Sequence, residues 1–364
     1  MLKFIVKRLL AAIPTLLLAL TLIFFLMRAL PGDPLYALLG NNDLATEEDV
    51  ARMAEQMELD GSYLDQYLRY MSNIFTGDWG DSYFMGVSVF EAIMSRIEPT
   101  LMLTWMSLLI NIGIGVPLGI LGATHKNTLV DYSASTFSIV FMCIPNFCLG
   151  ILLIYVFGYL IPIFPMSNYM KIAQNGFWKA CYSLILPAFS IGMTNVASTA
   201  RYTRAQMISV LSRDYIRTAR AKGLSLRNVY YKHALKNAFG TILTIVSGST
   251  LNCLGGSVVV ETVFNINGIG ALFSTALSRQ DYPLVQADVV VMTVLFIFIN
   301  ILVDIGYKLL DPQIRAYHAR QRDLADGAVS GDLCAGARLR RPLPLRPHDQ
   351  MARPRLARSS ARYG

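Results

Sequence analysis

The sequence predicts an all-α, polytopic membrane protein with about six transmembrane helices, and three observations support this fold class. Of the 364 residues, 54% are hydrophobic and only 15% are charged, whereas soluble domains carry roughly a quarter charged residues. Apolar stretches long enough to cross a bilayer core of about 30 Å recur along the chain. Basic residues gather in particular connecting segments instead of being spread evenly.

Six apolar stretches are the candidate spans, and the first five contain no Asp, Glu, Lys or Arg. The third is too long for one upright span, so we expect Pro162 and Pro165 to end its helix and leave 164–170 as a loop. The sixth carries Asp288 and Asp304 near its ends. A single stretch could be a buried helix of a large soluble protein, but six make that alternative negligible. The stretches are residues 9–27, 100–124, 132–170, 180–200, 237–260 and about 284–307.

The first stretch follows Lys3, Lys7 and Arg8, as the apolar part of a cleaved signal peptide would. It is longer than the usual signal-peptide core, and no small-residue cleavage site follows it. We therefore expect residues 1–30 to be a retained transmembrane anchor.

Charge asymmetry orients the spans, because cytoplasmic loops carry an excess of Lys and Arg. The loop 201–237 holds nine basic residues and one acid, Asp214, so we expect it in the cytoplasm. Residues 31–98 hold three basic and thirteen acidic residues, so we expect them outside. Six alternating spans then place both termini in the cytoplasm.

Two further segments differ from the spans in composition. Residues 46–49 resemble a helix start, and 59–70 interleave apolar and polar residues at helical spacing, so we expect 31–98 to form a small external helical subdomain. Residues 316–364 contain ten Arg and no Lys. We expect this basic tail to be disordered; it could bind acidic lipid or be an appendage without function.

Metal, disulfide and nucleotide sites are not indicated. The five cysteines have no metal or redox spacing, and the four histidines are scattered. The sequence has no Gly-x-x-x-x-Gly-Lys-Ser/Thr phosphate loop. We therefore expect this chain to bind no metal and no ATP.

The basic loop has local helical order of its own. From Ser212 to Gly223 it has a hydroxyl residue for a helix cap, good helix formers, and a glycine placed to end the helix in a left-handed conformation. A second helix can begin at Ser225, with one face formed by Leu226, Val229, Tyr230, His233 and Ala234. Such helices suit insertion into a groove of another protein, or contact with acidic lipid; composition leaves both open.

The loop resembles a known motif. Residues 214–224, Asp-Tyr-Ile-Arg-Thr-Ala-Arg-Ala-Lys-Gly-Leu, followed by 233–238, His-Ala-Leu-Lys-Asn-Ala, are similar to the EAA loop of ABC importer permeases of the dipeptide and oligopeptide branch. Arg217, Thr218 and Ala219 stand where the general motif has Glu-Ala-Ala, and the later isoleucine and proline are also replaced. Other motifs with the same resemblance are residues 31–34, 261–264 with Gly268 and Gly270, 281–283 and 311–315.

The resemblance, over roughly residues 1–315, implies a type I ABC importer permease fold with a core at 99–310. The chain would be a permease subunit in a bacterial inner membrane, and not an enzyme. Its implied partners are a paralogous second permease, two cytoplasmic ATPases that use ATP and Mg, an external solute-binding protein and membrane lipid, with no nucleic acid. Its solute would be a dipeptide, oligopeptide, glutathione or a nickel complex. The residues implied in ATPase coupling are Asp214, Tyr215, Arg217, Thr218, Ala219, Arg220, Ala221, Lys222, Gly223, Leu224, His233, Leu235 and Asn237.

The residues that line the solute pathway are not identified by the sequence. Polar residues within the spans are candidates, although hydrogen bonding between helices explains them as well. Glycines in the second span favour close helix packing. An ion-driven transporter or channel, or a scaffold for a cytoplasmic partner, remains the alternative function. The residues concerned are Asn111, Asn146, Asn195, Asn252 and Asn300 and, for packing, Gly113, Gly115 and Gly119.

Overall fold

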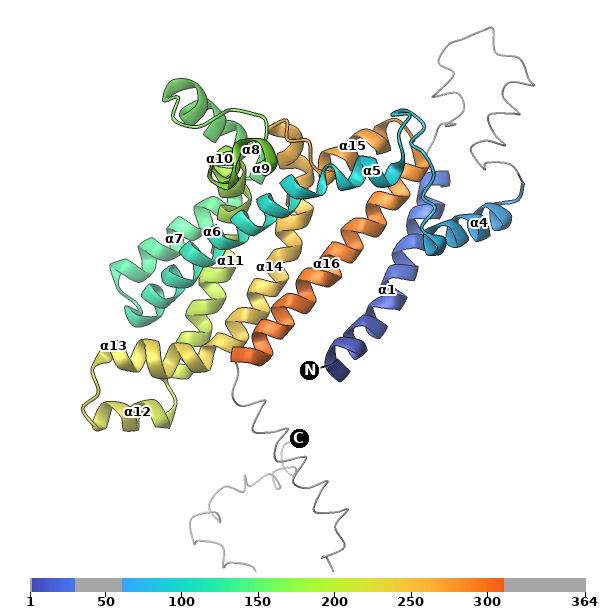
Figure 1. Ribbon diagram of the computed structural model, residues 1–364. Coiled ribbons are helices and arrows are strands. Elements are labelled where there is room, and N and C mark those ends of the chain that lie inside the picture. Colours follow the sequence, from blue (N-terminus) through green and yellow to red (C-terminus); the bar gives the residue numbers. More distant parts are fainter. Residues whose placement is uncertain (1, 30–60, 311–364) are drawn as a thin grey trace, which may run out of the picture. The chain divides into compact units, whose positions relative to one another are not determined.

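The computed structural model describes residues 2–29 and 61–310, which are mostly helical and contain no β-strand (Figure 1). The all-α fold class is therefore confirmed, whereas the predicted helix start at 46–49 and the tail 316–364 lie outside the described residues. The first elements are α1 (Leu2–Ala29), α4 (Tyr63–Thr76), α5 (Val89–Met94), α6 (Ile97–Thr124), α7 (Leu129–Cys143), α8 (Asn146–Leu153) and the π-helix η1 (Ile154–Leu160). The others are α9 (Ile172–Asn175), α10 (Phe177–Ser183), α11 (Ile185–Leu211), α12 (Asp214–Ala221), α13 (Leu226–Asn228), the π-helix η2 (Val229–Leu235), α14 (Lys236–Val263), α15 (Ile269–Ser278) and α16 (Tyr282–Leu310).

The described helices provide six candidate spans, if each of two bent helix pairs counts as one span. This confirms the prediction of about six. Four candidate spans are not bent pairs: Arg8–Ala29, Val89–Thr124, Leu226–Val263 and Tyr282–Leu302. The bent pairs are Leu129–Cys143 with Asn146–Leu160, and Phe177–Ser183 with Ile185–Leu211.

The third span is not the single helix that the sequence predicted up to Pro162. α7 and α8 meet at a bend of 96°. Ile144 is extended there (φ −90°, ψ 120°), because the ring of Pro145 disfavours a helical residue directly before it. The loop expected at 164–170 is present.

The fourth span extends further than predicted. α11 continues to Leu211 and includes Arg201 and Arg204, which the sequence assigned to the connecting loop. Met207 and Val210 are fully buried, so apolar packing continues the helix beyond the uncharged stretch.

α6 and α11 pack closely through glycine. A Cβ atom at Gly115 would lie 2.9 Å from the Thr199 Cβ, and one at Gly119 would lie 2.6 Å from the Ala200 carbonyl oxygen. The predicted close packing is confirmed at these two positions. It is wrong for Gly113, which is exposed and would have no atom within 4 Å of an added Cβ.

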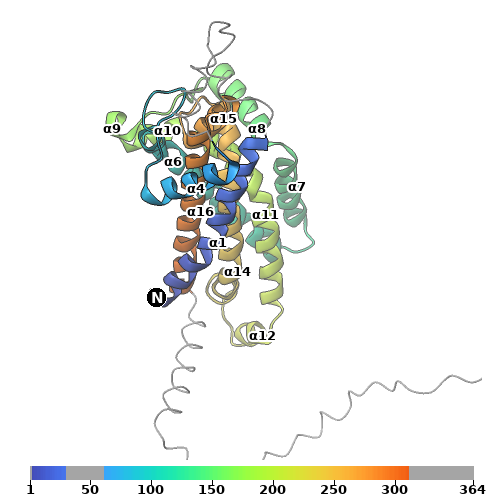
Figure 2. The same cartoon turned by 90° about the vertical axis from the view of Figure 1, so that its right-hand side faces the viewer.

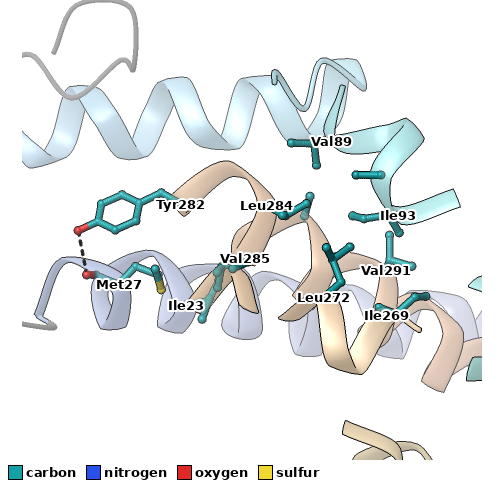
Figure 3. Close-up of a cluster of buried hydrophobic side chains, with 13 residues drawn as sticks. Ile23, Met27, Val89, Ile93, Ile269, Leu272, Tyr282, Leu284, Val285 and Val291 are labelled. Carbon is teal, nitrogen blue, oxygen red and sulfur yellow. Dashed lines mark hydrogen bonds between the residues drawn. The ribbon is translucent and has the colours of Figure 1, made fainter. Parts of the chain in front are cut away.

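The end of α1 and the beginning of α16 join α5 and α15 in a buried apolar cluster (Figure 3). The Tyr282 hydroxyl donates a hydrogen bond to the Met27 carbonyl oxygen at 3.1 Å. Val285, Leu272 and Ile93 pack within the cluster. Residues more than 250 positions apart in sequence are thereby held together.

Glu261 fixes α15 against α6 and α14. Its side chain is fully buried, with Oε1 accepting from the Thr100 hydroxyl at 2.7 Å and Oε2 from the Ala271 N–H at 2.9 Å. A Cβ at Gly268 would collide with this carboxylate. The glycine and the glutamate that the sequence singled out therefore belong to one packing arrangement.

Candidate coupling site and pathway surface

Helix α12 lies at one end of the helices, with α13, the beginning of α1 and the end of α16, whereas α4, α5 and α15 lie at the other (Figures 1 and 2). Ile216 and Ala219 form its buried side. Ile216 belongs to an apolar cluster with Val210 of α11, Val229 of η2 and Ile242 of α14. α12 thus packs against η2 and shares one apolar cluster with the ends of α11 and α14.

The C-terminus of α12 has the hydrogen bonds of a Schellman motif. The Gly223 N–H donates to the Arg220 carbonyl oxygen at 2.9 Å, and the Leu224 N–H to the Ala219 carbonyl oxygen at 3.4 Å. Gly223 has φ +79°, the left-handed conformation that the sequence predicted for it. An added Cβ would meet no atom within 4 Å, so only the backbone conformation requires glycine here.

The N-terminus of α12 differs from the prediction. Ser212 does not cap it, because its hydroxyl donates back to the Ser209 carbonyl oxygen and Arg213 occupies the cap position without a side-chain bond. The second helix begins at Ser225 as predicted, and the Ser225 hydroxyl caps it by accepting from the Asn228 N–H at 3.4 Å.

The face predicted for the second helix is only partly buried. Val229 and Ala234 are fully buried, whereas Leu226 is 56% exposed. Leu226 precedes the π-helical turn η2, whose wider spacing instead places the buried Val229 and Ala234 five positions apart.

The residues predicted to couple to an ATPase are mostly exposed, and nine of the exposed ones lie on α12 or directly after it. Ala219 is the exception, because it is only 8% exposed and faces the protein interior. Asp214 and Arg217 form an exposed ion pair at 3.8 Å. His233 and Leu235 are half-buried in η2. The exposed members are Asp214, Tyr215, Arg217, Thr218, Arg220, Ala221, Lys222, Gly223, Leu224 and Asn237.

An ion pair that the sequence analysis missed joins α11 and α7. Arg204 of α11 binds Asp131 of α7 through two hydrogen bonds of 2.7 Å each. The Asp131 side chain is buried and also accepts from the Asn127 N–H. Asp131, an acid at the start of an apolar helix, was the only sign of this pair in the sequence. Its partner could not be identified because Arg204 is 73 residues away.

Comparison with known proteins identifies the family. Residues 115–316 match the family model described as the inner membrane component of binding-protein-dependent transport systems, and residues 1–104 match the N-terminal model of such membrane components. The chain belongs to this family.

Similar curated proteins include three permeases, each aligned over 86% of this chain and 99% of its own length. The probable peptide ABC transporter permease y4tP of Sinorhizobium fredii is 38% identical. The oligopeptide permease AppB of Bacillus subtilis is 36% identical, and the glutathione permease GsiC of Escherichia coli is 37% identical.

The protein is therefore an inner-membrane permease subunit of an ABC importer. Such subunits are not enzymes themselves, and the ATPase activity resides in partner subunits. The family implies ATPase and solute-binding-protein partners.

The five asparagines of the spans now separate into classes. Asn146, Asn195 and Asn300 hydrogen-bond to atoms of α14 at 3.4, 3.8 and 3.0 Å, as expected for contacts between helices. Asn111 is buried and has no hydrogen-bond partner among the described residues. Asn252 is exposed on α14.

Asn252 belongs to an exposed stripe along the permease's α14 helix, in which six of eight residues are glycine, threonine or asparagine. The spacing of three or four positions places them on one face. Gly248 and Gly255 have open space around them, with no atom within 4 Å of an added Cβ. We call this face the α14 stripe; it consists of Thr241, Thr244, Gly248, Leu251, Asn252, Gly255, Val259 and Thr262.

Proposed function

We propose that the permease carries peptides or related small solutes inward, and that α12 couples this movement to ATP hydrolysis in a partner. The names of the relatives support the solute class, since they are described as peptide, oligopeptide and glutathione permeases. ATP and Mg act in the ATPases, and this chain holds neither.

The packing of α12 is the observation that carries the coupling proposal. Its inner side packs on η2, and Ile216 lies in one apolar cluster with residues of α11 and α14, while Asp214, Arg217, Thr218 and Ala221 are exposed. A groove on an ATPase can accept this outer face, because Thr218 and Ala221 are small. Motion of the docked helix then passes to two spans as a rigid-body movement.

The orientation follows from charge. The loop that holds α12 is strongly basic, so we assign it to the cytoplasm. The beginning of α1 and the end of α16 lie at the same end of the helices as α12 (Figure 1), which supports two cytoplasmic termini.

The α14 stripe supports a solute pathway between this subunit and a paralogous second permease. Lipid offers no partner for the Asn252 amide, whereas a hydrated path or a second subunit does. The hydroxyls of Thr244 and Thr262 already donate to carbonyl oxygens of α14 itself. The solute-binding protein would deliver solute at the opposite end from α12.

Co-purification tests the assignment. The tagged full chain is purified in mild detergent from its host, with Ala221→Glu on the outer face of α12 as the test variant. Ala173→Glu, on the exposed side of α9 at the opposite end, is the matched control. We expect an ATPase and a second permease with the wild type and the control, and at least tenfold less ATPase with Ala221→Glu because a carboxylate cannot enter a close contact unpaired. Equal ATPase recovery from both variants contradicts docking by α12. Absence of any ATPase favours an ion-driven transporter or a scaffold.

A backbone test separates a coupler from a scaffold that only binds the ATPase. Gly223→Val places a β-branched residue in the left-handed region, at a cost of roughly 1–2 kcal/mol or more. We expect uptake to be lost while the chain stays in the membrane, and Gly223→Asn, which tolerates this conformation, to retain most uptake. Normal solute uptake by the Gly223→Val variant would contradict the coupling proposal.

A further inference from the structure

A cavity of about 510 Å³ lies between the end of α1, α4, the segment before α5 and the beginning of α16. This volume is typical of small-molecule sites. Helix α4 and the end of α1, which line the cavity, lie at the end of the helices opposite α12 (Figure 1). We call it the Arg28 cavity, and the residues that matter below are Arg28, Gln66, Tyr70, Asp78, Trp79 and Asp81.

Arg28 supplies a positive charge that is not neutralised by any carboxylate of the described residues. Its Nε and Nη2 donate to the Gln66 Oε1 at 2.9 and 2.7 Å, and its Nη1 donates to the Phe24 carbonyl oxygen at 3.4 Å. The guanidinium lies 3.5 Å from the centroid of the Phe24 ring. These neutral contacts hold the group in place and leave further N–H donors for an anion.

Two buried donors line the same cavity. Neither the Tyr70 hydroxyl nor the Trp79 Nε1 has a hydrogen-bond partner among the described residues. Their rings are held by aromatic neighbours, with Tyr70 stacked on Phe24 at 5.6 Å and Trp79 tilted against Phe90 at 5.8 Å. Burial raises the pKa of Tyr70, so its hydroxyl keeps its proton. An unpaired buried donor costs about 1–3 kcal/mol, which an acceptor in the cavity would relieve.

Two exposed carboxylates, Asp78 and Asp81, also line the cavity. They disfavour a ligand with several negative charges and favour an ammonium group. Donors and carboxylates together therefore match a molecule that carries one oxyanion and one ammonium group.

We propose that the Arg28 cavity binds a small zwitterion, with its oxyanion on Arg28, Tyr70 and Trp79 and its ammonium group toward Asp78 and Asp81. Two sources supply this chemistry. One is a phosphatidylethanolamine headgroup, since the apolar outward face of α1 leads up to Arg28. The other is a short peptide with charged termini.

Tryptophan fluorescence of the purified full-length chain tests this proposal. The chain has three tryptophans, and the other two, Trp105 and Trp178, are 45% and 82% exposed, so both can become phenylalanine without disturbing a core. Trp79 is then the only reporter. The protein is titrated with dihexanoyl phosphatidylethanolamine and, separately, with dialanine, and the fluorescence of Trp79 is recorded. Dihexanoyl phosphatidylglycerol, which has no ammonium group, is the chemical control.

A saturable change in Trp79 fluorescence with phosphatidylethanolamine alone identifies the lipid as the source. A saturable change with dialanine alone identifies a peptide as the source. Either result supports the site. Arg28→Gln should weaken binding by about tenfold or more, and Tyr70→Phe, which removes one oxygen and keeps the ring packing, by about threefold to tenfold. The proposal is overturned if neither zwitterion gives a saturable change, if phosphatidylglycerol binds as tightly, or if both variants retain the original affinity.

Discussion

Helices α1 and α14 are both 28 residues long and predominantly apolar, yet they present opposite outward surfaces. The outward face of α1 is leucine-rich, with Leu10, Leu18 and Leu22 each about 60% exposed. α14 instead turns Ile242 and Val246 inward and leaves the α14 stripe outward. A similar apolar composition can therefore serve a lipid contact in one helix and a pathway or subunit contact in another.

Chemical labelling should separate the two faces most strongly. With the five native cysteines replaced, Asn252→Cys on α14 should react with a charged thiol reagent about 100-fold faster than Leu18→Cys on α1, because the reactive thiolate is disfavoured in hydrocarbon. The measurement is the labelling rate in intact importer complexes. Equally slow labelling of both cysteines would contradict the proposed difference between the two faces. It would place the α14 stripe against lipid or in a dry interface.

A bulky side chain on the α14 stripe should block the solute. Gly248→Phe fills open space without a clash in this chain, so we expect normal amounts of protein and at least about tenfold lower uptake. Ala11→Phe, on the exposed face of α1, is the matched control and should change uptake less than twofold. If both variants transport normally, Gly248 does not face the pathway.

The smallest effect on uptake is expected from removing the side-chain amide of Asn252. Asn252→Leu should weaken apparent solute affinity by about threefold to tenfold, the value of one hydrogen bond, while Asn252→Ser should retain part of it. Uptake measured over a range of solute concentrations distinguishes a change in KM from a change in maximal rate. A change in maximal rate alone would indicate a structural role for Asn252.

Local signals explain which parts of the coupling surface were predictable. The helix stop at Gly223 and the cap at Ser225 depend on a few neighbouring residues, and both are present in the structure. Ala219 was predicted to be a coupling residue, and only the packing of the inner side of α12 shows that it faces inward. For the same reason Ala219 is unsuitable as a docking test, whereas Ala221 is exposed.

The sequence by itself determined that the chain is an all-α membrane protein with about six spans, because length and apolar composition are properties of contiguous residues. Only the tertiary structure decided which face of each helix is outward, and that Arg28, Tyr70 and Trp79 line one cavity. Those features depend on contacts between residues distant in sequence. Composition and helical spacing do not specify such contacts when a helix is apolar on most sides.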